Sequence, residues 1–443
     1  MAGAGALLQE ARALFQGGQG PRALTAYRRL VLLDPDCAPG WAGFGRQLLA
    51  LNDAAAAEDA CRRALALDPE QLEARQDLAR CLMLRERLPE ALALLEPAVA
   101  QAPGDPEVTT LLMNIFIRQG DDGALRREML RRVDADFTGV EAQWERACVQ
   151  LLCGDLAGGW EAFEARRQLP GVPAFRLRCP QPQWQGEPLA GRTLLLHWEQ
   201  GFGDTLQFIR FAPQVRAQGG RVLLLAQREL ADLAGTCPGV DQVVAHGDPL
   251  PPFDLYLPLL SLPRVLGTEL ATIPAEIPYL DVPAGVPHRT ALAGLLAPSR
   301  GRTRVGLCWS GSATHSRDRQ RSLPHQLLAP LGALPGVAWH SFQKEGEPAP
   351  LPGLVELGPS LGTFSDTAYA LSGMDLVITV DTALAHLAGA LGVPTLLLLA
   401  YLPDWRWLMG RDDSPWYPTL RLYRQTLPGD WAGVIRQVLA DLG

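Results

Sequence analysis

A 34-residue period in the first half of the chain constrains the fold more than any other feature of the sequence. Three prolines recur at this spacing, Pro35, Pro69 and Pro103, and three alanines recur with them, Ala23, Ala57 and Ala91. Such a period is typical of a solenoid, in which each unit buries its apolar face against the next. Small residues let two antiparallel helices approach closely, and each proline prevents the second helix from continuing. The period predicts an α-helical solenoid with units starting near residues 4, 38, 72, 106 and 140.

Within each unit, large and small residues follow a fixed pattern. The second unit shows it most fully, with Trp41, Phe44, Gly45, Leu48, Ala57, Ala64 and Pro69. This pattern resembles the tetratricopeptide repeat. The fourth unit has Phe137 in place of the proline, and the fifth keeps Gly154, Trp160 and Phe163, as expected where a solenoid is capped or joins another domain. Such arrays commonly offer a groove to a protein partner; the alternative is an array that only stabilises its neighbour.

The second half, from about residue 170, consists of a proline-rich connector followed by short apolar runs and helical stretches. The runs do not alternate with polar residues, so they are predicted to be buried parallel strands. They cover residues 193–198, 221–226, 242–246, 254–259, 303–310, 337–343, 375–380, 394–400 and 420–425. A segment rich in Pro, Ala and Gly separates the first four from the last five. We expect an α plus α/β chain, with a solenoid over 1–169 and two Rossmann-like lobes over 170–298 and 299–443.

Composition narrows the function and the location. The 443 residues carry a formal charge of −8 and a pI near 5.5, which argues against a nucleic-acid partner because phosphate binding relies on excess Lys and Arg. We expect no membrane span, because no apolar run is long enough, and no secretory signal at the start of the chain. The eight cysteines form no CxxC pair and are predicted to pack in the core, which fits a reducing cytoplasm.

Two strand ends of the second lobe carry anion-binding chemistry. Asp381 and Thr382 follow the run 375–380 and begin a helix, whose free amides carry about half a positive charge. The run 303–310 opens into a loop at Ser310 and Gly311. Basic residues follow this loop at His315, Arg317, Arg319 and Arg321. Amides, hydroxyls and cations together are suited to phosphate oxygens. The alternatives are an ordinary helix cap and a solvated basic loop.

Lys344 follows the strand predicted over 337–343 and is singled out by composition. Of the 40 basic residues, it is the only lysine. Arginine serves everywhere else, so a lysine that survives is a candidate for a task that needs a compact ammonium group. Survival by chance is the alternative.

In the first lobe, the segment 197–211 (HWEQGFGDTLQFIRF) leaves a strand through a glycine turn and enters a helix. Asp204 stands at the start of this helix, with Glu199 and Gln200 as further candidates on the acceptor side. A carboxylate at this place could take the proton from an acceptor hydroxyl. The alternative role for Asp204 is that of a helix cap.

Four segments carry a family resemblance: GFGDTLQFIR, the WSGS loop with RDRQRS, TVDTALAHLAGALG, and DWRWLMGRDDSPWYPTLRLYRQ. Together they resemble the bacterial proteins that join tetratricopeptide repeats to a GT-B glycosyltransferase. The second half is similar to family 9 heptosyltransferases and more distantly to family 41 O-GlcNAc transferases. The resemblance implies an inverting, metal-independent transferase without a cofactor, whose nucleotide-sugar donor is held mainly by the second lobe.

The same resemblance assigns roles to individual residues. Asp204 matches the proposed base, and Asp381, Thr382 and His386 match the donor block, whereas Lys344 matches a donor-phosphate lysine only by its lobe. A protein acceptor held by the repeats, for example a flagellar or surface protein, is implied by the domain pairing. Two alternatives remain open: a scaffold with an inactive transferase half, and a lipopolysaccharide-type transferase.

Two further features of the C-terminal segment are predicted to be structural. The pair Asp412–Asp413 superficially resembles the metal-binding carboxylates of other transferases, and we expect no metal there. An aromatic group is expected to pack the segment rather than stack on a ligand: Trp405, Trp407, Trp416 and Tyr417.

Overall fold

The computed structural model describes residues 2–51, 53–102, 105–119, 121–136, 139–169, 175–312 and 318–443. The chain divides into two compact units between residues 138 and 139, and each unit is described by itself. In the part of the chain that the structure describes, no helix combines the length and the apolar character that crossing a membrane requires.

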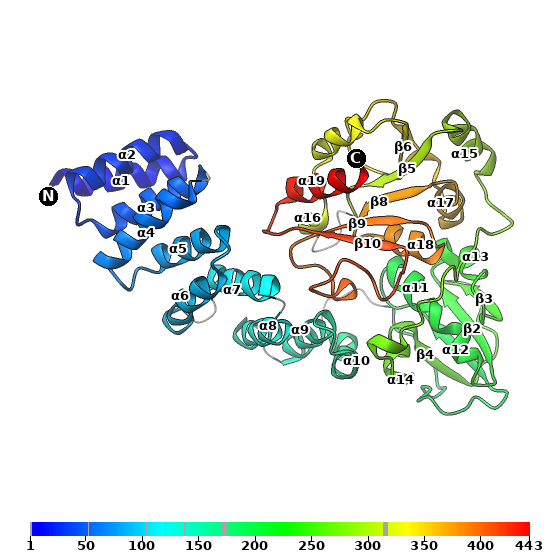
Figure 1. The fold of residues 1–443 in the computed structure, drawn as a ribbon. Coiled ribbons are helices and arrows are strands. Elements are labelled where there is room, and N and C mark those ends of the chain that lie inside the picture. Colours follow the sequence, from blue (N-terminus) through cyan, green and yellow to red (C-terminus); the bar gives the residue numbers. More distant parts are fainter. Residues whose placement is uncertain are drawn as a thin grey trace. The chain divides into compact units, whose positions relative to one another are not determined.

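The first unit is a series of antiparallel helix pairs (Figure 1). Its helices are α1 (Ala2–Gln16), α2 (Gly20–Leu33), α3 (Ala38–Ala50), α4 (Ala54–Leu67), α5 (Leu72–Leu84), α6 (Leu88–Gln101), α7 (Pro106–Gln119) and α8 (Asp122–Asp136). A β-carbon on Gly45 would lie 2.6 Å from the Sγ atom of Cys61, so glycine is required where α3 crosses α4. The predicted solenoid and its frame are confirmed; Pro103 and Phe137 lie outside the described residues.

The second unit begins with one more helix pair, α9 (Gly139–Leu152) and α10 (Leu156–Phe163), followed by the 3₁₀ helix η1 (Glu164–Gln168). The turn between α9 and α10 contains Gly154, whose φ of +81° is in the left-handed region that favours glycine. The fifth predicted repeat therefore belongs to the same compact unit as the strands that follow it.

Two all-parallel sheets form the rest of this unit (Figure 1). The first has the order β3-β2-β1-β4 and the second β10-β9-β8-β5-β6-β7. The strands are β1 (Thr193–His197), β2 (Arg221–Ala226), β3 (Gln242–Ala245), β4 (Leu255–Pro258), β5 (Thr303–Cys308), β6 (Val337–Ser341), β7 (Val355–Glu356), β8 (Leu376–Val380), β9 (Thr395–Leu399) and β10 (Leu420–Arg424). All nine predicted strands are confirmed, and β7 alone was missed because two residues show no periodicity.

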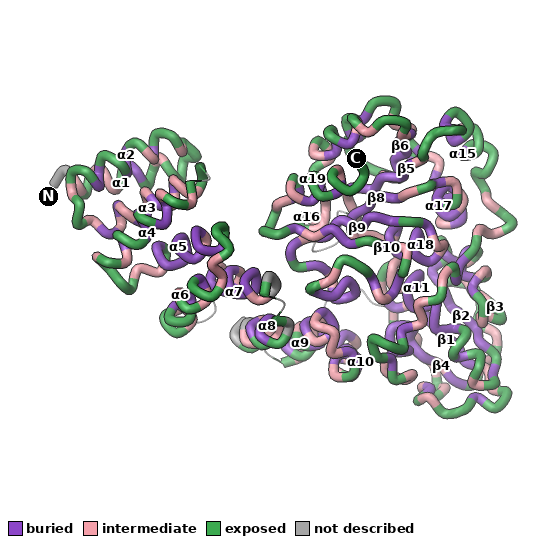
Figure 2. Tube along the Cα trace, in the orientation of Figure 1, coloured by how far each residue is buried: buried purple, intermediate pink, exposed green. Residues whose placement is uncertain are grey.

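The strands lie in the interior and the outer faces of the helices are exposed, as Figure 2 shows. β9 is buried along its whole length, as expected for an inner strand of a parallel sheet that is covered on both faces. The core of the second lobe packs side chains of β5, β6, β8 and β9 against α19 (Trp431–Leu442). The eight cysteines all lie in the described residues and form no disulfide, and Cys61, Cys81, Cys237 and Cys308 are buried.

A buried arginine joins the two lobes. Arg210 follows α11 (Phe202–Phe208) and donates to the hydroxyl of Tyr279 at 2.9 Å and to the carbonyl oxygen of Pro274 at 3.2 Å. Its guanidinium lies 4.3 Å from the ring centroid of Tyr417, which belongs to the second lobe. Tyr279 continues the connection, because its backbone N–H donates to the carbonyl oxygen of Ala390 at 3.0 Å. This packing brings together the edges of the two sheets at which the strands end.

Candidate functional site

A cleft of about 730 Å³ lies between the loop that follows β1 and the carboxyl ends of the strands of the second sheet. Parallel strands end at one edge of a sheet, and loops at that edge are the usual place for a ligand in such folds. Nine of the ten residues predicted for the site line this cleft: Gln200, Asp204, Ser310, Gly311, Arg321, Lys344, Asp381, Thr382 and His386. The tenth, Glu199, is buried and does not line it.

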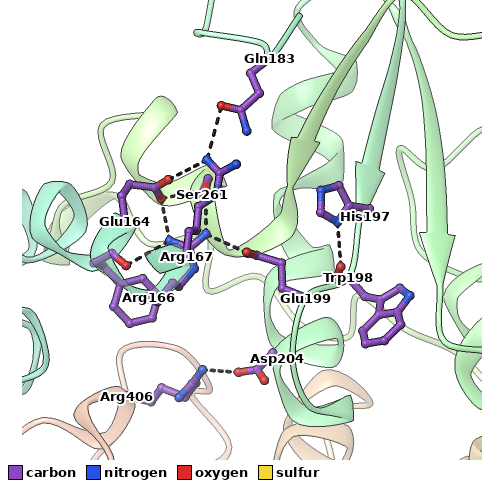
Figure 3. Close-up of polar contacts among 11 residues, drawn as sticks. Glu164, Arg166, Arg167, Gln183, His197, Trp198, Glu199, Asp204, Ser261 and Arg406 are labelled. Atoms are coloured by element: carbon purple, nitrogen blue, oxygen red, sulfur yellow. Dashed lines mark hydrogen bonds and ion pairs between the residues drawn. The ribbon is translucent and has the colours of Figure 1, made fainter. Parts of the chain in front are cut away.

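Asp204 lies in the first turn of α11, with 15% of its side chain exposed. Its Oδ2 atom accepts a hydrogen bond from the Gly201 N–H at 2.7 Å, so the alternative role as a helix cap is realised. Its Oδ1 atom accepts a hydrogen bond from Arg406 (Figure 3). Burial raises the pKa of the Asp204 carboxyl, and the charge of Arg406 opposes that rise. A carboxylate that caps the helix and is partly exposed at the cleft wall retains lone pairs for a proton.

Arg406 is the residue at this site that the sequence interpretation missed. It comes from the 3₁₀ helix η9 (Trp405–Trp407) of the second lobe and lines the cleft. Its Nη1 atom donates to Asp404 at 2.8 Å, and its Nε atom donates to the Oε1 atom of Gln207 at 2.6 Å. Arg406 stands in DWRW, one of the segments that carry the resemblance, but nothing in that segment distinguishes it from the other arginines of the chain.

His386 lies on α18 (Ala383–Ala390), where α11 packs against it. A β-carbon on Gly203 would lie 2.9 Å from the His386 ring, so the glycine turn of the first lobe is needed for this approach. The Nδ1 atom of His386 and the Tyr417 hydroxyl are hydrogen-bonded at 2.9 Å. Burial lowers the pKa of His386 to about 3, so the ring is uncharged at neutral pH. His386 therefore contributes a packing surface and a hydrogen bond to the site, and no charge.

Asp381 and Thr382 stand between β8 and α18, as predicted. The Oγ1 atom of Thr382 accepts from the Leu384 N–H at 3.3 Å and caps the helix. Arg321 donates to the carbonyl oxygen of Asp381 at 3.1 Å, which places a cation beside the helix start. Burial, together with the neighbouring charge of Asp404, raises the pKa of Asp381 to about 6. This end of the cleft therefore offers a helix N-terminus and a guanidinium beside a carboxyl group that protonates readily.

The loop after β5 is held by Gln343, which follows β6. The Oε1 atom of Gln343 accepts from the backbone N–H groups of Trp309 and Ser310 at 3.2 and 3.1 Å, and its Nε2 atom donates to the Ser310 hydroxyl at 2.7 Å. A β-carbon on Gly311 would lie 2.4 Å from Arg321, so this loop passes close to the cation. His315 and Arg317 lie outside the described residues, and the Arg319 side chain is not described.

Lys344 is exposed at the rim of the cleft, next to Gln343. Among the described residues, no hydrogen bond or ion pair is formed by its ammonium group. A cation that lines a cleft and is not neutralised by a neighbour is available to an anionic ligand.

Glu199 is placed away from the cleft by a buried ion pair, which Figure 3 shows. Its Oε2 atom accepts from the Nη2 atom of Arg166 at 2.7 Å, and Nη2 also donates to the Ser261 hydroxyl at 2.7 Å. Arg166 bonds further to Glu164 at 2.6 Å, with 1% of its own side chain exposed. Glu199 thus attaches the first lobe to η1 of the last repeat.

The last helix pair also contacts the segment that carries Arg406. The backbone N–H of Met409 donates to the carbonyl oxygen of Leu152 at 3.1 Å. The rings of Trp160 and Phe163 both lie 5.3 Å from that of Trp405. The last helix pair holds the turn that bears Arg406, and η1, which follows that pair directly, holds the loop before Asp204.

The aromatic group of the C-terminal segment packs in the interior, as predicted. The aromatic group is buried throughout: Trp405, Trp407, Trp416 and Tyr417. Asp413 forms two hydrogen bonds with Arg411, both 2.6 Å long, which lower the pKa of its carboxyl group. Among the described residues, no group of three or more His, Cys, Asp or Glu side chains is arranged to hold a metal ion.

Comparison with known proteins finds both halves of this architecture. Residues 8–71 and 48–115 match models of the tetratricopeptide repeat, and residues 354–408 match the model of glycosyltransferase family 9 (heptosyltransferase). The last match contains Asp381, Thr382, His386 and Arg406. Protein FlbA of Caulobacter vibrioides is 26% identical to the chain, and the alignment covers 95% of this chain and 81% of that protein.

Solved structures match part of the chain at low similarity. YrrB, described as a TPR protein with an unusual peptide-binding site, is 18% identical, with 37% of this chain and 84% of that chain covered and a TM-score of 0.30. PilF of Pseudomonas aeruginosa is 17% identical, with 37% and 75% covered and a TM-score of 0.32. The repeats and the partial match to a glycosyltransferase domain thus occur together in one chain.

Proposed function

We propose that the protein is a GT-B glycosyltransferase that moves a sugar from a nucleotide-sugar to an acceptor hydroxyl, with inversion and without a metal or other cofactor. One observation carries the proposal: a single cleft joins a partly exposed carboxylate of the first lobe, Asp204, to the anion-binding strand ends of the second lobe. The match of residues 354–408 to a glycosyltransferase domain supports it.

The mechanism follows from the positions of these groups. Asp204 accepts the proton of the acceptor hydroxyl while that oxygen attacks the anomeric carbon. The bond between this carbon and the donor phosphate breaks on the opposite face, so the configuration inverts, and the nucleotide leaves with the electron pair. The leaving phosphate would be stabilised by the N-terminus of α18 at Thr382, by Arg321 and by Lys344. Ser310 and Gly311 would contribute a hydroxyl and an amide to the donor, and Gln200 borders the acceptor side.

The repeats are proposed to hold a protein acceptor. Tetratricopeptide repeats are protein-docking modules, and this chain joins them to the proposed transferase. Cysteines that serve as packing residues fit a reducing compartment, so we propose that the reaction takes place in the cytoplasm. An inactive scaffold and a lipopolysaccharide-type transferase are the competing functions, and the experiments below separate them.

Calorimetry with a panel of UDP-, GDP-, CMP- and ADP-sugars tests the donor site. We expect one nucleotide class to bind, with its sugar transferred to protein in an extract of the source cells. Failure of every sugar nucleotide to bind would contradict the proposal and favour the scaffold. Binding accompanied by transfer to lipopolysaccharide, and not to protein, would favour the third function.

Deleting residues 1–138 should separate donor binding from acceptor docking. Every group that lines the cleft lies in the second unit, so the shortened chain should bind the nucleotide-sugar as the full chain does. Transfer to the protein acceptor should be lost, because the docking surface is gone. Calorimetry and incorporation of labelled sugar measure the two effects, and circular dichroism verifies folding. Transfer at the full rate by a folded, shortened chain would show that the repeats do not hold the acceptor.

Substituting Lys344 tests the argument from composition. Lys344→Ala should weaken donor binding by roughly 1.5–3 kcal/mol, the worth of a hydrogen bond to a charged group. Lys344→Arg should recover only part of this loss, because a planar guanidinium replaces a compact ammonium. Nucleotide affinities of both variants decide the matter. An arginine variant that binds as tightly as the wild type would remove Lys344 from the site.

A further inference from the structure

Three groups from both lobes meet at the guanidinium of Arg406. Its Nη2 atom donates to Asp204 and its Nε atom to Gln207, at 2.6 Å, and both partners lie on α11 of the first lobe. Its Nη1 atom donates to Asp404 of its own segment at 2.8 Å. Asp204 and Gln207 are three residues apart and therefore share one face of the helix. Arg406 of the second lobe thus binds two residues on one face of α11, the helix that bears the proposed base.

This set of contacts requires a guanidinium. Three nitrogens donate in three directions from one rigid plane, whereas a lysine would present a single ammonium point charge. The residue type alone carries no weight in a chain with 39 arginines and one lysine. The geometry of Arg406 does indicate a specific role, because only 11% of its side chain is exposed and all three of its nitrogens have acceptors.

The turn that bears Arg406 is itself fixed. Its guanidinium lies 4.2 Å from the ring centroid of Trp405, which packs edge to face against Trp160 of the last repeat. Trp407 is fully buried and stacks on His386 with ring centroids 5.2 Å apart. The two tryptophans that flank Arg406 therefore fix the backbone from which its side chain extends to the first lobe.

We propose that Arg406 is a positioning residue: it orients the Asp204 carboxylate toward the acceptor hydroxyl, pairs with its negative charge, and ties the base of one lobe to the donor side of the other. The inference rests on the proposed function, because it assigns Arg406 a task only if Asp204 is the base. It adds a residue that neither the motifs nor the position of the strand ends had indicated.

The charges around Asp204 determine the direction of the expected pH effect. Arg406 is the nearest cation and Arg166 a more distant one, while Asp404 contributes a negative charge from the same side. His386 beside Gly203 is uncharged. Burial raises the pKa of Asp204, and the two arginines oppose this rise. Without Arg406, this pKa should rise further, so the base would stay protonated up to a higher pH and the acidic limb of the rate profile should move upward.

The test compares Arg406→Gln and Arg406→Lys with a matched control, Arg411→Gln. Arg411 lies in the same segment, and the ion pair that its side chain forms within the described residues is with the exposed Asp413, so the control should behave as the wild type. In Arg406→Gln we expect kcat to fall about 10²-fold, as for a misplaced catalytic group, with little change in donor affinity. The acidic limb of kcat/KM should shift upward by about 1–3 pH units. Arg406→Lys should return the acidic limb to its wild-type position, because the positive charge is restored. It should restore only part of kcat, because an ammonium group cannot donate to Asp204, Gln207 and Asp404 in the geometry of the guanidinium.

An acidic limb that stays in place in Arg406→Gln, or a lysine variant with full kcat, would overturn the inference. Loss of donor binding in Arg406→Gln would do so too, since it would make Arg406 a donor ligand. A double-mutant cycle on the melting temperature of Arg406→Gln, Asp204→Asn and their combination needs no substrate. We expect the two shifts to be non-additive because both variants remove the same ion pair. If the wild type transfers no sugar, the proposed function fails. Additive shifts of the melting temperature in this cycle would show, independently of transfer, that Arg406 and Asp204 are not coupled as proposed.

Discussion

Asp204→Asn should lower turnover about 10²–10⁴-fold, the usual worth of general-base assistance, and leave donor affinity nearly unchanged. The amide keeps the size of the carboxylate, and its oxygen can still accept a hydrogen bond from the Gly201 N–H or from Arg406. It cannot take up a proton at neutral pH. The helix cap therefore largely survives while the base is removed, which makes the variant a test of chemistry and not of folding.

Steady-state rates and nucleotide affinities measure this effect, with Asp413→Asn as the control. Asp413 is an exposed aspartate whose carboxylate pairs with Arg411 of its own segment, so the control should keep full turnover. Turnover of Asp204→Asn within a factor of about three of the wild type would place the base elsewhere. Asp381 would then be the first candidate, because it lines the same cleft and its pKa is raised to about 6. Glu199 would not, because it is buried against Arg166.

The arrangement of the fold could be predicted from periodicity because periodicity is a local property. The 34-residue period determined where the helix pairs begin, and runs of apolar residues without alternation identified nine strands. The location of the cleft followed from a general property of parallel sheets, in which the strands end at one edge. That property was enough to bring Asp204, Arg321 and Asp381 to the same cleft from three distant segments.

The pairing of side chains across the cleft could not be predicted in this way. Arg406 meets Asp204 across 202 residues of sequence, and no local pattern indicates which of 39 arginines does so. Glu199 and Gln200 are neighbours at the end of one strand, yet only Gln200 lines the cleft while Glu199 is turned inward to Arg166. Such choices depend on tertiary packing and on which charges become buried, and neither is encoded in spacing.

Arg166→Met should destabilise the second unit by about 3–5 kcal/mol at neutral pH, the cost of leaving a buried charge without its partner. Arg166 and Glu199 are almost completely buried, with 1% and 6% of their side chains exposed. Arg166 also bonds to Ser261, so its removal affects the first lobe and the last repeat together. Unfolding by urea measures the change. The adjacent Arg167→Met is the control, because its ion pair with Glu164 is partly exposed and worth about 1 kcal/mol or less.

The pH dependence of this defect distinguishes an unpaired charge from lost packing. Burial already raises the pKa of Glu199, and Arg166 opposes that rise, so the pKa should climb further in Arg166→Met. A carboxyl whose pKa is higher in the folded state stabilises the fold once it is protonated, and this contribution disappears as the pH rises through that pKa. The variant should therefore be less defective near pH 5 than near pH 8, and adding Glu199→Gln should restore much of its stability. A defect equal at both pH values, or unrelieved by Glu199→Gln, would mean that Arg166 acts through packing alone and that the first lobe does not depend on the charge of the last repeat.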